Sequence, residues 1–237
     1  MKKIFFAIIG LVILSFANAQ DKVVNDPNAE VRAVKGFHAI KVSTGIILML
    51  TQSNEEAVAV SAAKTEDRNK IVTAVENGVL KIYYDNKSMS YTTNNKKLRA
   101  YVSCKVLDGL NASSGAMVDV NGTIKSSNLN LNFSSGSGFK GDVSVTELKI
   151  DQGSGSTATI SGTATNISAE TSSGSALHAF DLQSDQCDAN ASSGASLEIS
   201  VRKTLKADAS SGGQISYKGN SVATTIHKGS GGQVSKE

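Results

Sequence analysis

The chain has 237 residues, with 24 Lys or Arg and 21 Asp or Glu, which gives a formal net charge of +3. Its 21 glycines, single proline, absence of tryptophan and 5% aromatic content are unusual for a globular enzyme and favour repetitive β-structure built from small residues. Without Lys2 and Lys3 in the N-terminal segment, 22 basic residues face 21 acidic ones. This near-neutral balance argues against a nucleic-acid partner, which would require a concentrated basic face.

The first 19 residues have the pattern of a secretory signal peptide. Lys2 and Lys3 precede an apolar run over residues 4–16, and the Ala-Asn-Ala sequence at 17–19 supplies a small-x-small cleavage site. The alternative, an N-terminal membrane anchor, is disfavoured because the apolar run is short for a span. No later segment approaches the roughly 20 apolar residues of a spanning helix. We therefore predict a mature chain without a transmembrane segment, beginning at Gln20 and exported to the periplasm, cell surface or medium.

Residues 20–36 are expected to form a mobile lead-in, and residues 37–103 an N-terminal β-rich capping region. Alternating apolar runs at 37–42, 45–52 and 57–62 predict strands. Asn77-Gly78 suits a two-residue hairpin turn. In this hairpin, Ile71 would lie opposite Tyr84, Thr73 opposite Ile82 and Val75 opposite Leu80. A polar loop and a strand over 98–106 then lead into the rest of the chain.

From residue 104 to the C-terminus, a Ser-Gly pair recurs every 18 to 21 residues. A constant period of this size is typical of a solenoid. The seven pairs are Ser114-Gly115, Ser135-Gly136, Ser154-Gly155, Ser173-Gly174, Ser193-Gly194, Ser211-Gly212 and Ser230-Gly231.

Apolar residues occur at odd distances on both sides of each of these glycines. Seven residues before it lie Leu129, Leu148, Ile167, Cys187 and Leu205. Five before it lie Leu110, Leu131, Ile150, Ala169, Ala189, Ala207 and Ile226. Three after it lie Val118, Phe139, Ala158, Leu177, Leu197, Ile215 and Val234, and five after it lie Val120, Ile160, Ala179, Ile199 and Tyr217. Odd spacing throughout predicts strands with one buried face and not a helical stripe.

The predicted fold is therefore all-β: a parallel β-helix over residues 104–237 with about 19 residues in each coil, continuous with the cap as one domain. One coil cannot bury its apolar face alone, whereas stacked coils close a continuous core. Each Ser-Gly pair is expected to form a tight structural corner between two strands. The serine of each pair should point inward, where its hydroxyl would bond along the stack. Since a nucleophile requires a base and an oxyanion site, seven equivalent serines indicate structure and no catalytic residue.

An outward polar column precedes each glycine by four residues and is the candidate binding site. Close carboxylates on adjacent coils could bind Ca²⁺, hydrogen-bond to sugar hydroxyls or perform acid/base chemistry on glycans. The simplest alternative is a solvated face, since Asn and Asp suit a strand that leads into a turn. The column runs Asn111, Asn132, Asp151, Glu170, Asn190, Asp208 and His227, and the candidate binding residues are Asn132, Asp151, Glu170, Asn190 and Asp208.

The two cysteines are expected to be free thiols. The repeat register places Cys104 and Cys187 about four coils apart, beyond the roughly 7 Å Cα separation that a disulfide allows. The three histidines, His38, His178 and His227, share no ligand spacing, and the glycine-rich calcium nonapeptide is absent. The sequence thus predicts no metal site and no cofactor.

In combination, the motif Phe37-His38-x-Ile40-x-Val42, the strand Gly78-Val79-Leu80-x-Ile82 and the Ser-Ser-Gly coils resemble the head GIN domain family. The resemblance covers the chain from about Val34 onward. It implies a right-handed parallel β-helix, a location outside the cytoplasm of Bacteroidetes-type bacteria and a role described as adhesion, with no biochemical activity attached.

Two classes of function follow from these observations. The first is a non-enzymatic exported solenoid that binds a glycan or a cell-envelope component along an elongated face. The second is a polysaccharide lyase or hydrolase built on a β-helix. Enzymes of that kind usually carry long loops and aromatic or basic clefts on one face, whereas these repeats vary by only three residues in length and expose almost no aromatic side chain except Phe180. The first class is therefore favoured.

Overall fold

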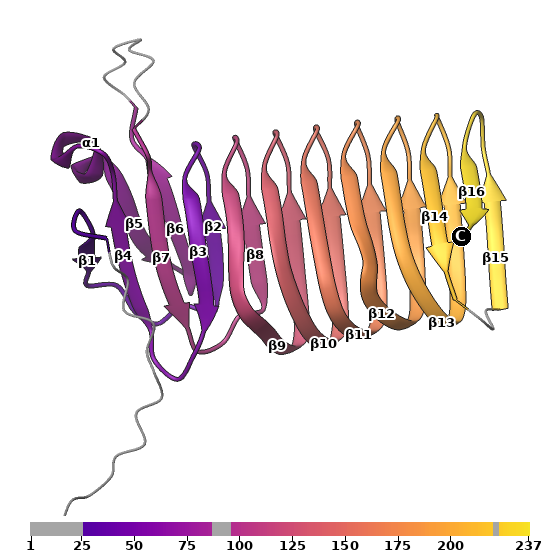
Figure 1. The fold of residues 1–237 in the computed structure, drawn as a ribbon, viewed down its shortest axis with the longest axis horizontal. Helices are drawn as coiled ribbons and strands as arrows, with labels where there is room; N and C mark the ends of the chain where they lie inside the picture. Colours follow the sequence, from indigo (N-terminus) through magenta and orange to yellow (C-terminus); the bar gives the residue numbers. More distant parts are fainter. Residues whose placement is uncertain (1–25, 87–95, 220–222) are drawn as a thin grey trace, which may run out of the picture.

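The computed structural model describes residues 26–86, 96–219 and 223–237. Strands stack along one long axis, with the N-terminal strands at one end and the C-terminal strands at the other (Figure 1). The stack is a β-solenoid of about seven turns with a spacing of about 19 residues, as predicted. The signal-peptide cleavage site expected after Ala19 lies outside the described residues.

The coils are formed by the long strands β9 to β13, with the shorter β8, β14, β15 and β16 at the two ends, and these strands pair in parallel with the equivalent strands of their neighbours. Each long strand bends around one side of the solenoid, and a tight turn closes the other side (Figure 1). The bounds of the coil strands are β8 (Gly109–Ala112), β9 (Met117–Phe133), β10 (Gly138–Gln152), β11 (Thr157–Thr171), β12 (Ala176–Ala191), β13 (Ser196–Ala209), β14 (Gln214–Lys218), β15 (Ala223–Lys228) and β16 (Gln233–Lys236).

The capping region is itself mostly a continuation of the stack. Strands β2 and β3 pair in parallel with β8 and β9, and β6 and β7 add a further layer on β2 and β3. Two antiparallel strands, β4 on β7 and β5 on β6, lie on this outer layer. The bounds are β2 (Ala39–Val42), β3 (Ile47–Gln52), β4 (Ala57–Ser61), α1 (Thr65–Asn69), β5 (Ile71–Glu76), β6 (Val79–Tyr84) and β7 (Arg99–Cys104).

The hairpin at Asn77-Gly78 has the predicted register, with Ile71 opposite Tyr84 and Val75 opposite Leu80. Both turn residues have positive φ, at 51° and 76°, which fits the predicted two-residue turn. The described part of the expected lead-in, residues 26–36, contains β1 (Glu30–Arg32), which pairs antiparallel with β4. Tyr101 also donates a hydrogen bond to Asp26, so this segment belongs to the cap.

The Ser-Gly pairs from Ser114-Gly115 to Ser211-Gly212 occupy two-residue turns in which serine and glycine both have positive φ, for example 52° at Ser114 and 73° at Gly115. The amide of Ala116 donates to the carbonyl of Ser113 and closes this turn. The turns also bond to one another, since the amide of the turn glycine donates to the carbonyl of the next turn serine over 3.0–3.1 Å from Gly115 through Gly194. Gly45 donates to Ser114 in the same way, so Thr44-Gly45 is an earlier member of the series.

The prediction that the turn serines point inward is wrong. The turn serines of the described coils are exposed at the tips of the turns. The residue after each glycine is the inward one, and Ser137, Ser156 and Ser175 are buried there. Their hydroxyls donate to backbone carbonyls of the preceding coil, as from Ser137 to Ala112 over 2.9 Å. Side chains alternate between the two faces only within a strand, and the alternation stops where the chain reverses direction. Odd and even spacing therefore does not predict the orientation of the turn serine and glycine.

The core consists of the predicted apolar columns. Residues at seven and five positions before the glycine, and at three and five after it, are buried in the central coils. Phe133 and Phe139 add a stacked aromatic pair with ring centroids 5.1 Å apart. Two positions differ from the expectation: Val120 is only partly buried, and Ile226 is exposed in β15, which pairs with β13.

Replacing Leu131 with Asp should destabilise the protein by several kcal/mol, because it buries a carboxylate without a partner in the core. Asn132→Asp is the matched control, since it adds the same group one residue further on, at the outer face. We expect that control to lower the free energy of unfolding by no more than about 1 kcal/mol, through repulsion from its register partner Asp151 at a partly exposed face. Urea denaturation measures both. Similar losses for the two variants would show that the faces are reversed.

Candidate functional site

The outward polar column is continuous in the structure. Adjacent members are direct register partners, so Asp151 lies between Asn132 on β9 and Glu170 on β11. Hydrogen-bonded strands are about 4.8 Å apart, which sets the spacing of these side chains. The same row extends across β12, β13 and β15 through Asn190, Asp208 and His227, and toward the cap through Asn111 and Lys41.

A groove of about 580 Å³ lies over the middle of this column. Apart from Phe133, which is almost fully buried, its lining residues are polar or glycine. Asn132, Asp151, Glu170 and Asn190 of the column line it, together with Phe133, Ser134, Gln152, Gly153, Thr171, Ser172 and Ser192. Asp208 belongs to the column but not to the groove lining.

Two carboxylates on this face form ion pairs with lysines. Lys149, two residues before Asp151 on β10, lies 3.5 Å from its carboxylate. Further along this face, Lys206 on β13 donates to Asp188 on β12 over 2.8 Å, and this bond, together with the nearby charges of Asp188 and Asp208, raises the pKa of Lys206. Glu170 makes no such ion pair among the described residues. The groove therefore presents acceptors, amides and hydroxyls in the combination that hydrogen-bonds to sugar hydroxyls.

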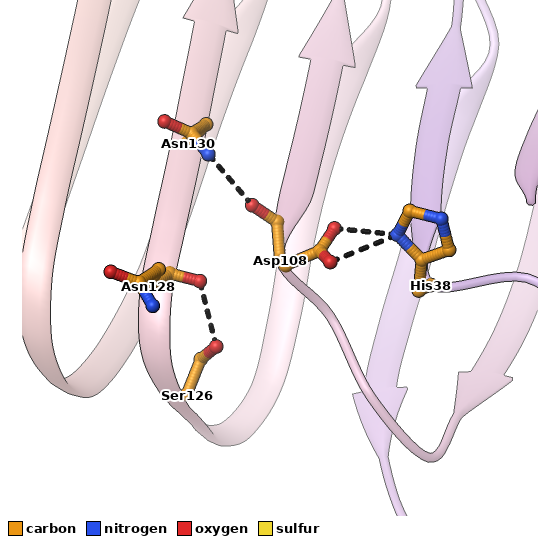
Figure 2. A network of polar contacts seen from close by, with 5 residues as sticks. All are labelled: His38, Asp108, Ser126, Asn128 and Asn130. Atoms are coloured by element: carbon orange, nitrogen blue, oxygen red, sulfur yellow. Dashed lines mark hydrogen bonds and ion pairs between the residues drawn. The ribbon is translucent and has the colours of Figure 1, made fainter.

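A histidine–carboxylate pair, which the sequence did not suggest, lies at the junction between cap and coils. Figure 2 shows His38 facing Asp108, with Nδ1 at 2.8 and 2.9 Å from the two carboxylate oxygens. Asp108 also accepts from Asn130 through its backbone carbonyl. The hydroxyl of Ser126 donates instead to the carbonyl of Asn128, so this network places no nucleophile against the imidazole.

The role of His38 is to join three segments. The His38 amide donates a hydrogen bond to the Gly78 carbonyl, and the His38 carbonyl accepts one from the Asp108 amide. A Cβ at Gly78 would lie 2.5 Å from His38 Nε2, so the hairpin glycine also leaves room for the ring. The pair thus connects the hairpin turn, β2 and the loop before β8.

Among residues 26–86, 96–219 and 223–237, no group of three or more His, Cys, Asp and Glu side chains could hold a metal ion. Cys104 and Cys187 are free and buried, on β7 and β12, with β3, β9, β10 and β11 between these strands. Burial raises the pKa of the Cys104 thiol to about 11 and that of Cys187 to about 12, with a smaller contribution from the carboxylates of Glu56 and Asp188. Neither thiol is poised as a nucleophile at neutral pH.

The chain matches the model of a family described as "Putative auto-transporter adhesin, head GIN domain" over residues 36–221. The chain belongs to the head GIN domain family. No curated protein matches it. Its fold is shared with a putative adhesin from Bacteroides fragilis, with a TM-score of 0.79 at 18% identity over 88% of this chain and 96% of that one.

Two further solved structures have the same fold. A putative adhesin from Parabacteroides merdae has a TM-score of 0.65 at 19% identity, covering 88% of this chain and 95% of that one. A putative lipid binding protein from Parabacteroides distasonis has a TM-score of 0.66 at 19% identity, covering 90% and 98%. Family membership and shared fold agree with the resemblance seen in the sequence. In the described part of the chain, no helix has the length and apolar character needed to cross a membrane.

We predict that both thiols remain unreactive toward an aromatic disulfide reagent at pH 8 until the protein unfolds. Their raised pKa values mean that folding favours the protonated thiols. The two thiols therefore make their full contribution to the free energy of unfolding below their ordinary pKa of 9.0. This contribution is lost as the pH rises through about 11 and about 12.

Urea denaturation of the wild type and of Cys187→Ala between pH 8 and 11 measures this effect. The alanine variant should lose less stability over that range than the wild type, because lysine and tyrosine titration is common to both proteins. Equal pH dependence, or rapid labelling of the native thiols, would contradict the assignment.

Proposed function

We propose that the protein is an exported, non-enzymatic solenoid that binds a glycan or another polysaccharide-like component of a cell envelope along the outward column, including the groove over its middle. The observation that carries the proposal is the register: Asn132, Asp151, Glu170 and Asn190 repeat one similar polar group on each successive coil. A linear saccharide repeats its hydroxyl groups over a length similar to one strand spacing. An extended ligand could therefore meet one side chain for each sugar.

The polarity of the groove supports a sugar over a lipid. Its only apolar side chain is that of Phe133, which is 2% exposed. One structural neighbour is named a putative lipid binding protein, but an acyl chain would require exposed apolar side chains, which the lining of this groove does not provide. Membership in a family described as adhesins is consistent with binding at a surface. We place the protein in the periplasm, at the cell surface or in the medium.

The competing class is a polysaccharide lyase or hydrolase that uses Asp151 and Glu170 as an acid/base pair. These two carboxylates are register partners on adjacent strands. Both belong to a row that also contains amides at equivalent positions. Binding of a repeating ligand requires such a row of similar groups, whereas a single catalytic centre does not require one. The two classes differ in their response to single substitutions.

Retention on a glycan array tests the proposal, with Asp151, Glu170 and Asp208 changed to Ala singly and together. Each single change should weaken binding about fivefold, since one exposed hydrogen bond contributes about 1 kcal/mol. The triple variant should lose about a hundredfold with an unchanged melting temperature. A catalytic pair would instead lose nearly all turnover from one substitution at Asp151 or Glu170.

The matched control is a triple Ala variant at Glu66, Asp119 and Asp181. These exposed carboxylates lie off the column, so the control removes the same charge from other surfaces. It should retain binding within about twofold. Unchanged glycan retention in the column variant, or an equal loss in the control variant, would overturn the proposal.

A further inference from the structure

A second pocket, of about 440 Å³, lies where the cap meets the first long coil. It is lined by Gln52, Ser53, Asn54, Lys105, Thr123 and Lys125. These residues come from the end of β3, the segment after β7 and the middle of β9. Two lysines and no acidic side chain line the pocket, which distinguishes it from the groove over the outward column.

The Gln52 side chain fixes the two lysine-bearing segments beside each other. Its Nε2 donates to the carbonyl of Lys105 over 3.1 Å and to that of Lys125 over 3.0 Å. Its Oε1 accepts from the amide of Lys125 over 2.7 Å. One amide side chain therefore connects three segments that are far apart in the sequence. A site whose backbone is already ordered loses less entropy when a ligand binds.

The loop that carries Ser53 and Asn54 is also ordered by hydrogen bonds. The Ser53 amide donates to the carbonyl of Cys104 over 2.8 Å, and its hydroxyl lies 2.7 Å from that of Ser103. Ser103 in turn donates to the carbonyl of Glu55. Glu55 thus contacts this network through its backbone and does not line the pocket.

The two ammonium groups are not neutralised by the surrounding protein. Lys105 and Lys125 take part in none of the ion pairs formed by residues 26–86, 96–219 and 223–237. The acidic residue in register with Thr123 on the next coil is Asp142, and its carboxylate accepts from Ser161 over 3.1 Å. Two unpaired positive charges at one ordered pocket favour an anionic ligand.

We propose that this pocket binds the acidic group of an anionic sugar, the carboxylate of a uronic acid. Lys105 and Lys125 would hold the oxyanion, while Ser53, Asn54 and Thr123 offer partners for ring hydroxyls. No apolar side chain lines the pocket, which disfavours the acyl region of an anionic lipid. The choice of a sugar rests on the proposed function, whereas the oxyanion site follows from the pocket alone.

Calorimetric titration of the mature chain with trigalacturonate, and with a neutral galactose trisaccharide, tests this inference. The wild type should bind the acidic trisaccharide at least tenfold more tightly than the neutral one. Lys105→Gln together with Lys125→Gln should weaken trigalacturonate binding at least tenfold without lowering the melting temperature. Lys35→Gln together with Lys140→Gln is the control, because it removes the same charge from exposed positions outside the pocket, and it should leave binding within twofold.

The triple Ala variant of the outward column separates this inference from the proposed function. It should bind trigalacturonate as the wild type does, even if it no longer retains neutral glycans. Equal wild-type affinity for the acidic and neutral sugars, or full affinity in the Lys105/Lys125 variant, would overturn the anionic-sugar site. Lysine-dependent binding to phosphatidylglycerol vesicles, with no binding of trigalacturonate, would also overturn it.

Discussion

The whole solenoid depends on hydrogen bonds that hold equivalent residues of adjacent coils in register. At the turns, the amide of Gly136 donates to the Ser154 carbonyl, and the amide of Gly155 donates to that of Ser173, both within 3.1 Å. The positive φ at these positions lets the chain reverse within two residues, so both legs of each coil remain in the stack. Since strand side chains alternate between faces, a slip of one residue would exchange the core with the surface.

The same register produces the surface features that could bind ligands. Buried columns require one apolar residue on every coil, and the outer face then presents polar residues in equally regular rows, such as Asp151 beside Glu170. The pocket with Lys105 and Lys125 arises differently. It forms where the repeat meets the cap, and the Gln52 side chain there bonds to backbone groups instead of packing in a column. Regular rows suit an extended ligand, whereas the junction suits one localised charged group.

The sequence predicts those parts of the structure that depend on alternation within a strand. The buried columns, the hairpin pairing of Ile71 with Tyr84 and the row of outward polar residues follow from local spacing. The turn serines are misassigned because alternation stops where the chain reverses. The turn at Thr44-Gly45 escapes notice because it has Thr for Ser and lies 70 residues before Gly115. The contact between His38 and Asp108, likewise 70 residues apart, leaves no local signal.

Removal of one coil is the most direct test of the claim that register controls this structure. Deleting residues 157–175 removes one coil and would let β12 pair with β10 in the register that β11 now has. Ala176 would then lie opposite Gly138, since Thr157 pairs with both of these residues. Thermal unfolding followed by far-ultraviolet circular dichroism should show a β-rich protein with one cooperative transition. A deletion one residue longer, 157–176, should abolish that transition, because it turns the apolar columns of the following leg outward. Equally cooperative unfolding of the two deletion variants would contradict the account.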